Sequence, residues 1–214
     1  MILALDLSHR LGLLSLELPG REPLTRVSDR PRDHFAFLQV ALTDLRQVSG
    51  RDWSELERVA VTLGPGSFTG LRIGLAVAKG LVFGRETPIL PLPSLALPAL
   101  AHPGPVLVCR RAQAGLYWTA FFEDGDPTPR EEAQRRQDEL AGWMASFPEA
   151  LPLGDDPGVD LGRPVQPEPP PEAQLSVLAS LAREENGLVR GADRDRLLPR
   201  YLAAPSIRMP GKKP

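Results

Sequence analysis

The sequence predicts an α/β fold of two lobes, in which mixed sheets are flanked by helices. Three short apolar runs lie close together near the N-terminus, as antiparallel hairpins require. Segments of helical and strand character then alternate to about residue 102. Hairpins followed by alternating helix and strand give a mixed sheet that helices cover.

The three N-terminal runs, residues 2–7, 11–18 and 24–28, are predicted strands. Only three residues separate the first two runs, so a hairpin is expected there. The third run is more polar, and Pro31 breaks the chain after it.

A helix is predicted over residues 33–49, with Asp33 as its N-cap and Gly50 after its end. Its apolar side chains cover roughly 220° of the helical wheel, about twice the stripe that one core needs. We expect one side of this helix to face the sheet and the other to face a neighbouring helix or another subunit. The apolar positions are Phe35, Phe37, Leu38, Val40, Ala41, Leu42, Leu45 and Val48.

A glycine-rich loop over residues 64–74, Gly-Pro-Gly-Ser-Phe-Thr-Gly-Leu-Arg-Ile-Gly, is the most distinctive segment. It follows a short helical turn at 52–56 and a predicted strand at 58–63, and it opens a helix that runs to about residue 83. Such a layout can aim a helix N-terminus at an anion. The loop lacks the lysine of a Walker loop, and its glycines are one residue too far apart for a dinucleotide fingerprint. A tight turn with close helix packing is the alternative to phosphate contact.

Small residues recur in the helix after this loop, where Gly70, Gly74 and Ala78 stand four apart. Their spacing places them on one face, where another helix could approach closely. A strand at 88–92 and a short helix capped by Ser94 complete the first lobe, residues 1–102. Ribonuclease-H-like folds have this order of elements, as does each lobe of the actin, hexokinase and Hsp70 superfamily.

The pattern is weaker over residues 103–198, which are predicted to form a smaller second lobe before a tail over 199–214. Two strands are expected at 105–109 and 116–123, and a helix at 172–185. The tail carries a few basic residues that could touch RNA, although a disordered terminus explains them as well; they are Arg208, Lys212 and Lys213.

Two further segments of the second lobe have marked compositions. The acidic and basic residues over 130–139 are most simply a solvated face. Eight of the 24 residues between 148 and 171 are proline. We therefore expect that segment to wrap the surface as loop and polyproline II, without a helix or a central strand.

The composition excludes several classes of protein. A formal net charge of −2 over 214 residues argues against a strongly basic nucleic-acid scaffold. Cys109 is the only cysteine and lies in an apolar run, so neither an intrachain disulfide nor a reactive thiol is expected. Asp6 interrupts the first apolar run too early for a signal peptide, and no stretch is long enough to span a membrane. We expect a cytoplasmic protein.

Asp6 and Ser8, at the end of the first predicted strand, could hold a magnesium–phosphate group, as in actin-like ATPases. An ordinary turn is the alternative, because both residue types bond to local backbone. The histidines His9, His34 and His102 are far apart and show no paired-ligand spacing, so no metal site is predicted. We interpret His34 as a capping or surface residue.

These motifs resemble those of the TsaB (YeaZ) family, which takes part in making threonylcarbamoyladenosine on tRNA. The resemblance spans nearly the whole chain and is strongest over residues 1–100. It rests on Asp6-Leu7-Ser8, Arg32-Asp33-His34, the glycine loop, Ala78-Lys79-Gly80-Leu81 and Tyr117-Trp118, in that order.

The resemblance implies an actin-like (ASKHA, ribonuclease-H-like) fold and a non-catalytic role. The catalytic relative TsaD carries a metal-binding H-x-x-x-H after the strand that corresponds to residues 88–92, whereas residues 93–99 here contain no histidine. The implied function is a scaffold that binds TsaD, and TsaE with it, and supports threonylcarbamoyl transfer to adenosine in tRNA. No intrinsic cofactor is implied; ATP or ADP with magnesium would bind weakly, at Asp6 and Ser8, within the complex, and tRNA would be reached indirectly.

The helices over 33–49 and 69–84 are expected to form the docking surface, because the first has more apolar surface than one core can use. Without TsaD, the same surface could pair with itself in a homodimer. The candidate interface residues are His34, Phe37, Ala41, Val48, Thr69, Arg72 and Ile73.

The chain departs from the family pattern in two places. Arg110-Arg111-Ala112 stands where relatives often have Asp-Ala-Arg, and Asp-Leu-Ser replaces the usual Asp-Thr-Ser. Two other functions stay open. A free-standing actin-like ATPase or kinase would use Asp6 and the glycine loop, and a metallopeptidase would need bound zinc or iron.

Overall fold

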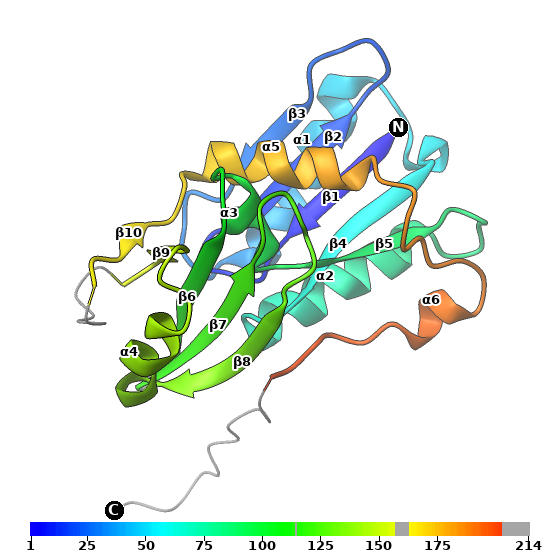
Figure 1. The fold of residues 1–214 in the computed structure, drawn as a ribbon. Coiled ribbons are helices and arrows are strands. Elements are labelled where there is room, and N and C mark those ends of the chain that lie inside the picture. Colours follow the sequence, from blue (N-terminus) through cyan, green and yellow to red (C-terminus); the bar gives the residue numbers. More distant parts are fainter. Residues whose placement is uncertain (114, 157–162, 203–214) are drawn as a thin grey trace, which may run out of the picture.

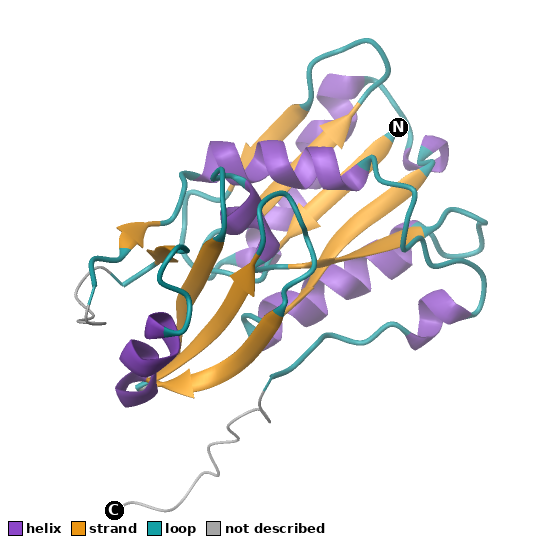
Figure 2. Ribbon diagram, viewed as in Figure 1, coloured by secondary structure: helices purple, strands orange, loops and turns teal. Residues whose placement is uncertain are grey.

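The computed structural model describes residues 1–113, 115–156 and 163–202. These residues form two five-stranded sheets, and helices flank both of them (Figures 1 and 2). Each sheet combines parallel and antiparallel pairs of strands. The predicted fold class, an α/β fold with two mixed sheets, is confirmed.

The first sheet is built around the N-terminal strand. β1 pairs antiparallel with β2 and parallel with β4, so the predicted hairpin is present and β1 lies at the centre. The order across the sheet is β3-β2-β1-β4-β5. Its strands are β1 (Ile2–Asp6), β2 (Leu13–Glu17), β3 (Leu24–Val27), β4 (Arg58–Gly64) and β5 (Ile89–Pro93).

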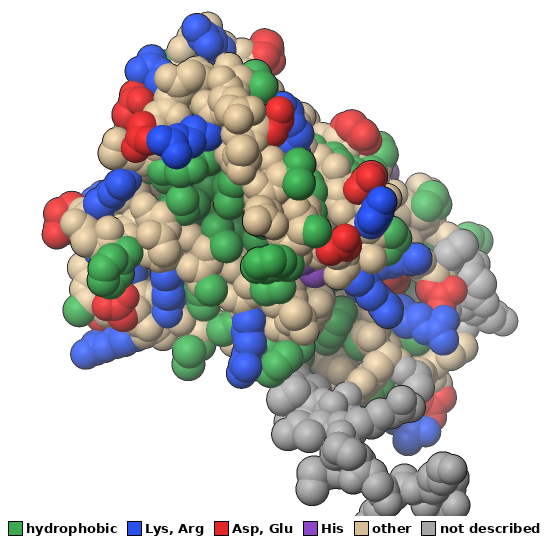
Figure 3. Space-filling model, turned by 180° about the vertical axis from the view of Figure 1, so that it is seen from behind, with side chains coloured by type: hydrophobic (Ala, Val, Ile, Leu, Met, Phe, Trp, Pro, Cys, Tyr) green, Lys and Arg blue, Asp and Glu red, His purple; other side chains and the backbone are tan. Residues whose placement is uncertain are grey.

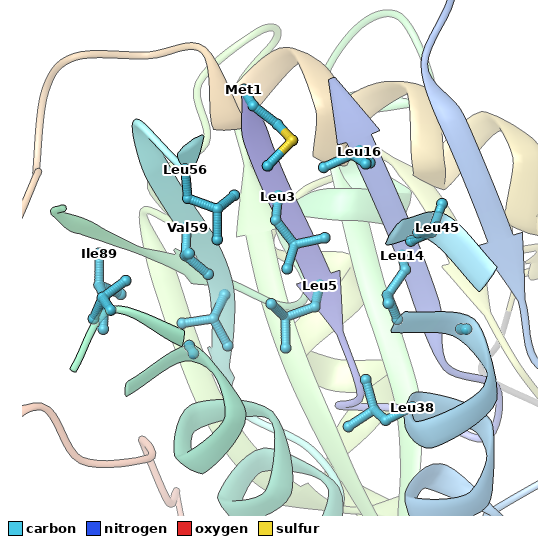
Figure 4. Packing of buried hydrophobic residues seen from close by; sticks show 14 of the residues in the cluster. Met1, Leu3, Leu5, Leu14, Leu16, Leu38, Leu45, Leu56, Val59 and Ile89 are labelled. Atoms are coloured by element: carbon cyan, nitrogen blue, oxygen red, sulfur yellow. The ribbon is translucent and has the colours of Figure 1, made fainter. Parts of the chain in front are cut away.

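Two helices, α1 (His34–Ser49) and α2 (Phe68–Leu81), cover one face of this sheet. Successive side chains of a strand point to opposite faces, so Leu3 and Leu5 of β1 lie together on this face with Leu38 of α1 (Figure 4). Burying each such leucine contributes about 2 kcal/mol. This cluster fixes α1 and α2 against β1.

The opposite face is covered by α5 (Pro171–Ala182), which contacts β1 and β2 although it follows the second sheet in the chain. The small side chains of Ala4 and Ala60 lie in the core on this face, which lets the helix sit close to the strands. The short α3 (Ala96–Leu100) packs beside α5. The chain therefore returns to the first sheet after it has formed the second.

The second sheet has the strand order β10-β9-β6-β7-β8. Helix α4 packs against one face, where Trp143 and Met144 share a core with Leu107 and Cys109. Burial raises the pKa of the Cys109 thiol to about 12, as befits an apolar role. The elements are β6 (Val106–Gln113), β7 (Leu116–Phe122), β8 (Glu131–Arg136), α4 (Gln137–Ala145), β9 (Leu151–Gly154) and β10 (Gln166–Pro167).

The charged residues over 130–139 are mostly exposed, as predicted, with the Glu132 side chain as a buried exception. They form β8, which pairs with β7, and the start of α4. Glu131 and Arg135 pair with each other on this strand, and the Arg135 guanidinium lies 4.6 Å from the Trp143 ring centre. Because β8 is an edge strand, paired charges can take the place of an apolar alternation.

The strand β9 lies inside the proline-rich segment and is internal to the sheet, so the prediction of loop and polyproline II is wrong there. The Leu151 N–H donates to the Pro105 carbonyl at 2.9 Å, which directs the N–H groups of Leu151 and Leu153 toward β6. The Pro152 nitrogen points to the other side, where β10 pairs only from Leu153 onward. The missing N–H therefore costs β9 no ladder hydrogen bond.

Two predicted helix caps are corrected by the structure. Asp33 occupies the N-cap position of α1, but its side chain makes no capping hydrogen bond. Ser94 lies one residue before the N-cap position of α3, and its hydroxyl instead donates to the buried Pro65 carbonyl at 2.5 Å. The predicted turn after α1 is confirmed as the 3-10 helix η1 (Trp53–Glu55), with a capping box at Asp52.

The chain after α5 runs back along α2. The Lys79 ammonium donates to the carbonyl oxygens of Asp195 and Leu197 at 2.7 and 2.9 Å. The short helix α6 (Asp193–Arg196) was not predicted, because its four residues are all charged and show no apolar period. The predicted basic tail, and residues 157–162 of the proline-rich segment, lie outside the described residues.

The small residues of α2 pack on the sheet and on the turn after β1, and Gly70 also lies against another helix, as predicted, because a Cβ atom there would lie 3.1 Å from the His34 side chain of α1. A Cβ atom added at Gly70 would clash with the carbonyl oxygen of Leu7. At Gly74 it would meet the side chains of Leu5, Leu7 and Val61 at 3.5 to 3.7 Å. The spacing thus identified a close-packed face, most of which meets the sheet and the turn after β1.

We predict that Gly70→Ala destabilises the chain while Gly80→Ala, in the same helix, does not. The Gly70 methyl group would meet a backbone oxygen that cannot move aside, which should lower the free energy of unfolding by about 2 kcal/mol or more. A methyl group at Gly80 would meet nothing within 4 Å and should stabilise the helix by up to about 1 kcal/mol. Urea unfolding of both variants measures this; equal stability of the two would contradict it.

Candidate functional site

A cavity of about 1090 Å³ lies where the first lobe meets the second. The turn after β1, the glycine loop and the start of α2 supply one wall, and strands of the second sheet supply the other. Residues near the described end of the chain complete it. The lining residues are Ser8, His9, Arg10, Arg32, Gly66, Ser67, Phe68, Arg72, Arg111, Ala112, Gln113, Trp118, Gln134, Asp155, Asp156, Arg200, Tyr201 and Leu202.

Asp6, one of the two predicted nucleotide-binding residues, does not line this cavity. Its carboxylate is buried and accepts hydrogen bonds from the Ser8 N–H at 2.8 Å and from the Thr62 hydroxyl at 2.5 Å. Both bonds hold the turn between β1 and β2 against β4. Both bonds are accepted by the same oxygen, Oδ1, and the role of Asp6 in binding a nucleotide stays a prediction.

Ser8, the other predicted residue, does line the cavity. Its hydroxyl oxygen is buried and has no hydrogen-bond partner among the described residues. Its carbonyl accepts from the Ser67 N–H at 2.7 Å, and a Cβ atom at Gly66 would collide with that carbonyl. The glycine loop is thus pressed onto the backbone of Ser8.

One polar pair crosses the cavity from lobe to lobe. His9 Nε2 lies 2.9 Å from a carboxylate oxygen of Asp155, whose other oxygen accepts from the Arg111 N–H at 2.8 Å. Burial by itself would raise the pKa of Asp155, but the hydrogen bonds from His9 and Arg111 outweigh it and lower that pKa. Sequence reasoning gave neither residue a role, because they lie 146 positions apart.

Five arginines line the cavity, in different electrostatic states. Arg111 pairs with Asp156 at 2.9 Å, and Arg200 with Glu132 at 2.7 Å. The Glu132 side chain is only 3% exposed, and burial raises its pKa. The other three arginines, Arg10, Arg32 and Arg72, form no ion pair with the described residues.

Arg110, which stands at the first departure from the family pattern, is buried away from the cavity. It is 1% exposed and binds Glu168 through two hydrogen bonds, of 2.6 and 2.8 Å. It also donates to the Gln174 side chain of α5 at 3.1 Å. The residue therefore ties β6 to the segment that leads back to the first sheet.

The candidate interface residues differ in exposure. His34 and Ala41 are buried, Phe37 and Ile73 are half-buried, and Val48, Thr69 and Arg72 are exposed. The interpretation of His34 as a capping or surface residue is wrong, since its ring is buried without a described partner and burial lowers its pKa. The role of these seven candidate residues in docking stays a prediction.

Two features of the described residues bear on other functions. No group of three or more His, Cys, Asp and Glu side chains placed to hold a metal ion was found among them. Among the helices of the described chain, none has the length and apolarity needed to cross a membrane.

Residues 29–153 match the profile of the family described as TsaD: tRNA N6-adenosine threonylcarbamoyltransferase. The tRNA threonylcarbamoyladenosine biosynthesis protein TsaB of Escherichia coli is 34% identical over 100 residues, which are 44% of this chain and 43% of that protein. TsaB of Haemophilus influenzae is 32% identical over 101 residues, 47% of this chain and 42% of that protein. The match thus covers less than half of these curated relatives. The structure of YeaZ from Pseudomonas aeruginosa superposes with a TM-score of 0.73 at 27% identity, over 94% of this chain and 99% of that one.

We predict that Asp155→Asn removes a pH-dependent part of the stability. A carboxyl whose pKa is lower in the folded than in the unfolded chain stabilises the fold above its unfolded pKa of about 3.9, and this contribution is lost as the pH falls through the folded pKa. The free energy of unfolding of the variant should be about 1–2 kcal/mol lower than that of the wild type at pH 7, and this difference should shrink below about pH 4. Urea unfolding from pH 7 to pH 3 tests this, with Asp29→Asn, an exposed aspartate, as the control. A difference that does not change with pH would refute it.

Proposed function

Since this chain belongs to the TsaD family, and within it is similar to TsaB (YeaZ), we propose that it is a non-catalytic subunit that binds TsaD. TsaE would join the same complex, which supports threonylcarbamoyl transfer to adenosine in tRNA. The coarser part of this proposal, a role in tRNA threonylcarbamoyladenosine biosynthesis, rests on the family and on the two TsaB relatives.

The apolar surface of α1 is the observation that carries the docking proposal. Phe35 and Val40 are each 70% exposed and Val48 is 54% exposed, while Leu38 and Leu45 of the same helix are buried in the core. Figure 3 looks at the face that α1 and α2 cover, and hydrophobic side chains gather there among charged ones. Apolar surface of this kind is typical of an interface.

A second observation supports a non-catalytic role. The resemblance places the metal-binding histidines of TsaD after β5, where this chain has serine, leucine and alanine instead. Ser94 there donates to the Pro65 carbonyl, and Leu95 and Leu97 are fully buried. This segment serves the packing between the glycine loop and the two sheets.

The other partners and ligands follow from the same proposal. Without TsaD, the α1 surface of two copies would meet in a homodimer. tRNA would be reached through the complex. ATP or ADP with magnesium would bind weakly within the complex, at Asp6 and Ser8; the two hydrogen bonds of the Asp6 carboxylate are both accepted by its Oδ1 atom.

We predict that Val40→Glu combined with Val48→Glu strongly weakens binding to TsaD. Both side chains are exposed, so the fold should remain, but two carboxylates would have to be buried unpaired in the interface. The dissociation constant should rise by about 100-fold or more, which isothermal titration with purified TsaD can measure. Phe37 is unsuitable for this test, because it packs against the core of the first lobe.

Ala141→Glu provides the matched control for this pair. It also adds a carboxylate at an exposed position of a helix, but on α4 of the second lobe, and should leave the affinity unchanged. Wild-type affinity in the double valine variant, with its fold verified by circular dichroism, would disprove docking through α1.

A further inference from the structure

We infer that residues 197–202, which we call the strap, lock the two lobes in one orientation, and that the ion pair between Arg200 and Glu132 fastens the strap to the second lobe. This inference concerns the orientation of the lobes and does not depend on the docking proposal. The strap follows α6, passes along α2 and reaches β8 at the described end of the chain (Figure 1).

The backbone joins the second sheet to the first lobe away from β8. The chain enters this sheet at β6, its central strand, and leaves it from β10, an edge strand. The opposite edge is β8, whose neighbours in the chain, β7 and α4, both belong to the second lobe. Neighbouring strands are about 4.8 Å apart, so β8 lies roughly 19 Å from β10. A contact at β8 therefore has the longest lever that this sheet offers against rotation about the two connections.

The strap is held on the first lobe by both backbone and side-chain contacts. The Arg200 N–H donates to the Leu63 carbonyl of β4 at 2.6 Å. The Tyr201 ring packs on Phe68 of α2, with 5.0 Å between the ring centres, and its hydroxyl accepts from Arg72 Nε at 3.0 Å. These contacts join the strap to a central part of the first sheet and to the helix that covers it, so the strap moves with the first lobe.

Glu132 of β8 receives the strap on the second lobe. It lies directly opposite Ala120 of β7, so both side chains are on the face of the sheet that packs on α3. The Glu132 side chain is 3% exposed, and Arg200 Nη2 lies 2.7 Å from its Oε2 atom. Among the described residues, Arg200 is its sole ion-pair partner, and neither carboxylate oxygen has another hydrogen-bond partner.

Packing alone does not explain a carboxylate at this position, because its neighbours Ala120 and Phe122 on the same face belong to an apolar core. Burial of an unpaired carboxylate is strongly unfavourable. Burial raises the pKa of Glu132, and the nearby Arg200 opposes this rise. Without the strap, Glu132 would have to take up a proton, or this edge of the sheet would have to move until water reaches the carboxylate. The charge of Glu132 thus ties the position of β8 to that of the strap.

Distances between spin labels on the two lobes test this inference. Cys109 is buried, so the full chain can be labelled selectively at Gln47→Cys on α1 and Ala141→Cys on α4, two exposed positions. Dilution with unlabelled chain restricts double electron–electron resonance to distances within one chain. We expect a narrow distance distribution when the strap is intact. Arg200→Gln should widen it about twofold or more, because glutamine cannot neutralise Glu132 and the lobes can then rotate.

Glu132→Gln is a second variant, which removes the ion pair without leaving a buried carboxylate unpaired. It should fold, and it should widen the distribution in the same direction. Arg196→Gln is the matched control, since Arg196 is an exposed arginine of α6 that pairs with Asp193 of the same helix. It should leave the distribution unchanged.

The inference is overturned if Arg200→Gln or Glu132→Gln keeps the narrow distribution while circular dichroism shows an intact fold. It is also overturned if Arg196→Gln widens the distribution as much as Arg200→Gln does. TsaD is absent from this measurement, so its outcome is separate from that of the docking test.

Discussion

The contact between the glycine loop and the turn after β1 is the constraint on which the rest of this structure depends. Gly66 and Gly70 have no Cβ atom, so the loop and the first turn of α2 lie directly on the carbonyl groups of Leu7 and Ser8. The Ser67 N–H completes the contact by donating to the Ser8 carbonyl at 2.7 Å. This contact sets how deeply α2 sits on the sheet, and with it the floor of the cavity between the lobes.

Distant parts of the chain are built onto the same contact. The Arg200 N–H donates to the Leu63 carbonyl at 2.6 Å, and the Arg200 carbonyl oxygen lies only 2.5 Å from the position that a Cβ atom of Gly64 would take. The Tyr201 ring then packs on Phe68, with 5.0 Å between the ring centres. The glycine loop has the layout of a phosphate-binding loop, but here its glycines let other backbone segments pack directly against it. The positive charge at the cavity comes from arginine side chains around the loop.

The sequence predicts elements whose signals are local. The apolar runs of β1 and β2, the helices α1, α2 and α5, and the glycine loop all lie where their periodicity and turn residues indicate. It does not predict contacts that depend on where distant segments meet. Asp33 and Ser94 have the residue types of helix caps, yet Ser94 is recruited by the Pro65 carbonyl 29 positions away. No local signal marks β9. The strand tolerates Pro152 only because the proline nitrogen, which carries no hydrogen, lies on the side where β10 pairs from Leu153 onward.

The candidate site shows the same division. Ser8 and the glycine loop, found from their motifs, do line the cavity, whereas Asp6 does not, and its Oδ1 atom accepts from the Thr62 hydroxyl and the Ser8 N–H. The pairing of His9 with Asp155, and the convergence of Arg10, Arg32 and Arg72, could not be predicted. These contacts depend on how close the two lobes lie to each other. A single sequence contains no measure of the distance between them.

The return of α5 to the first sheet makes the second lobe an insertion in the first, entered after β5 and left before α5. Two chain crossings join the lobes, so rotation of one against the other is restricted to an axis that passes near both. A chain cut after residue 102 would leave one face of β1 and β2 bare, and would therefore not be an autonomous folding unit. The second sheet, β6 to β10, is by contrast formed by one continuous segment of the chain.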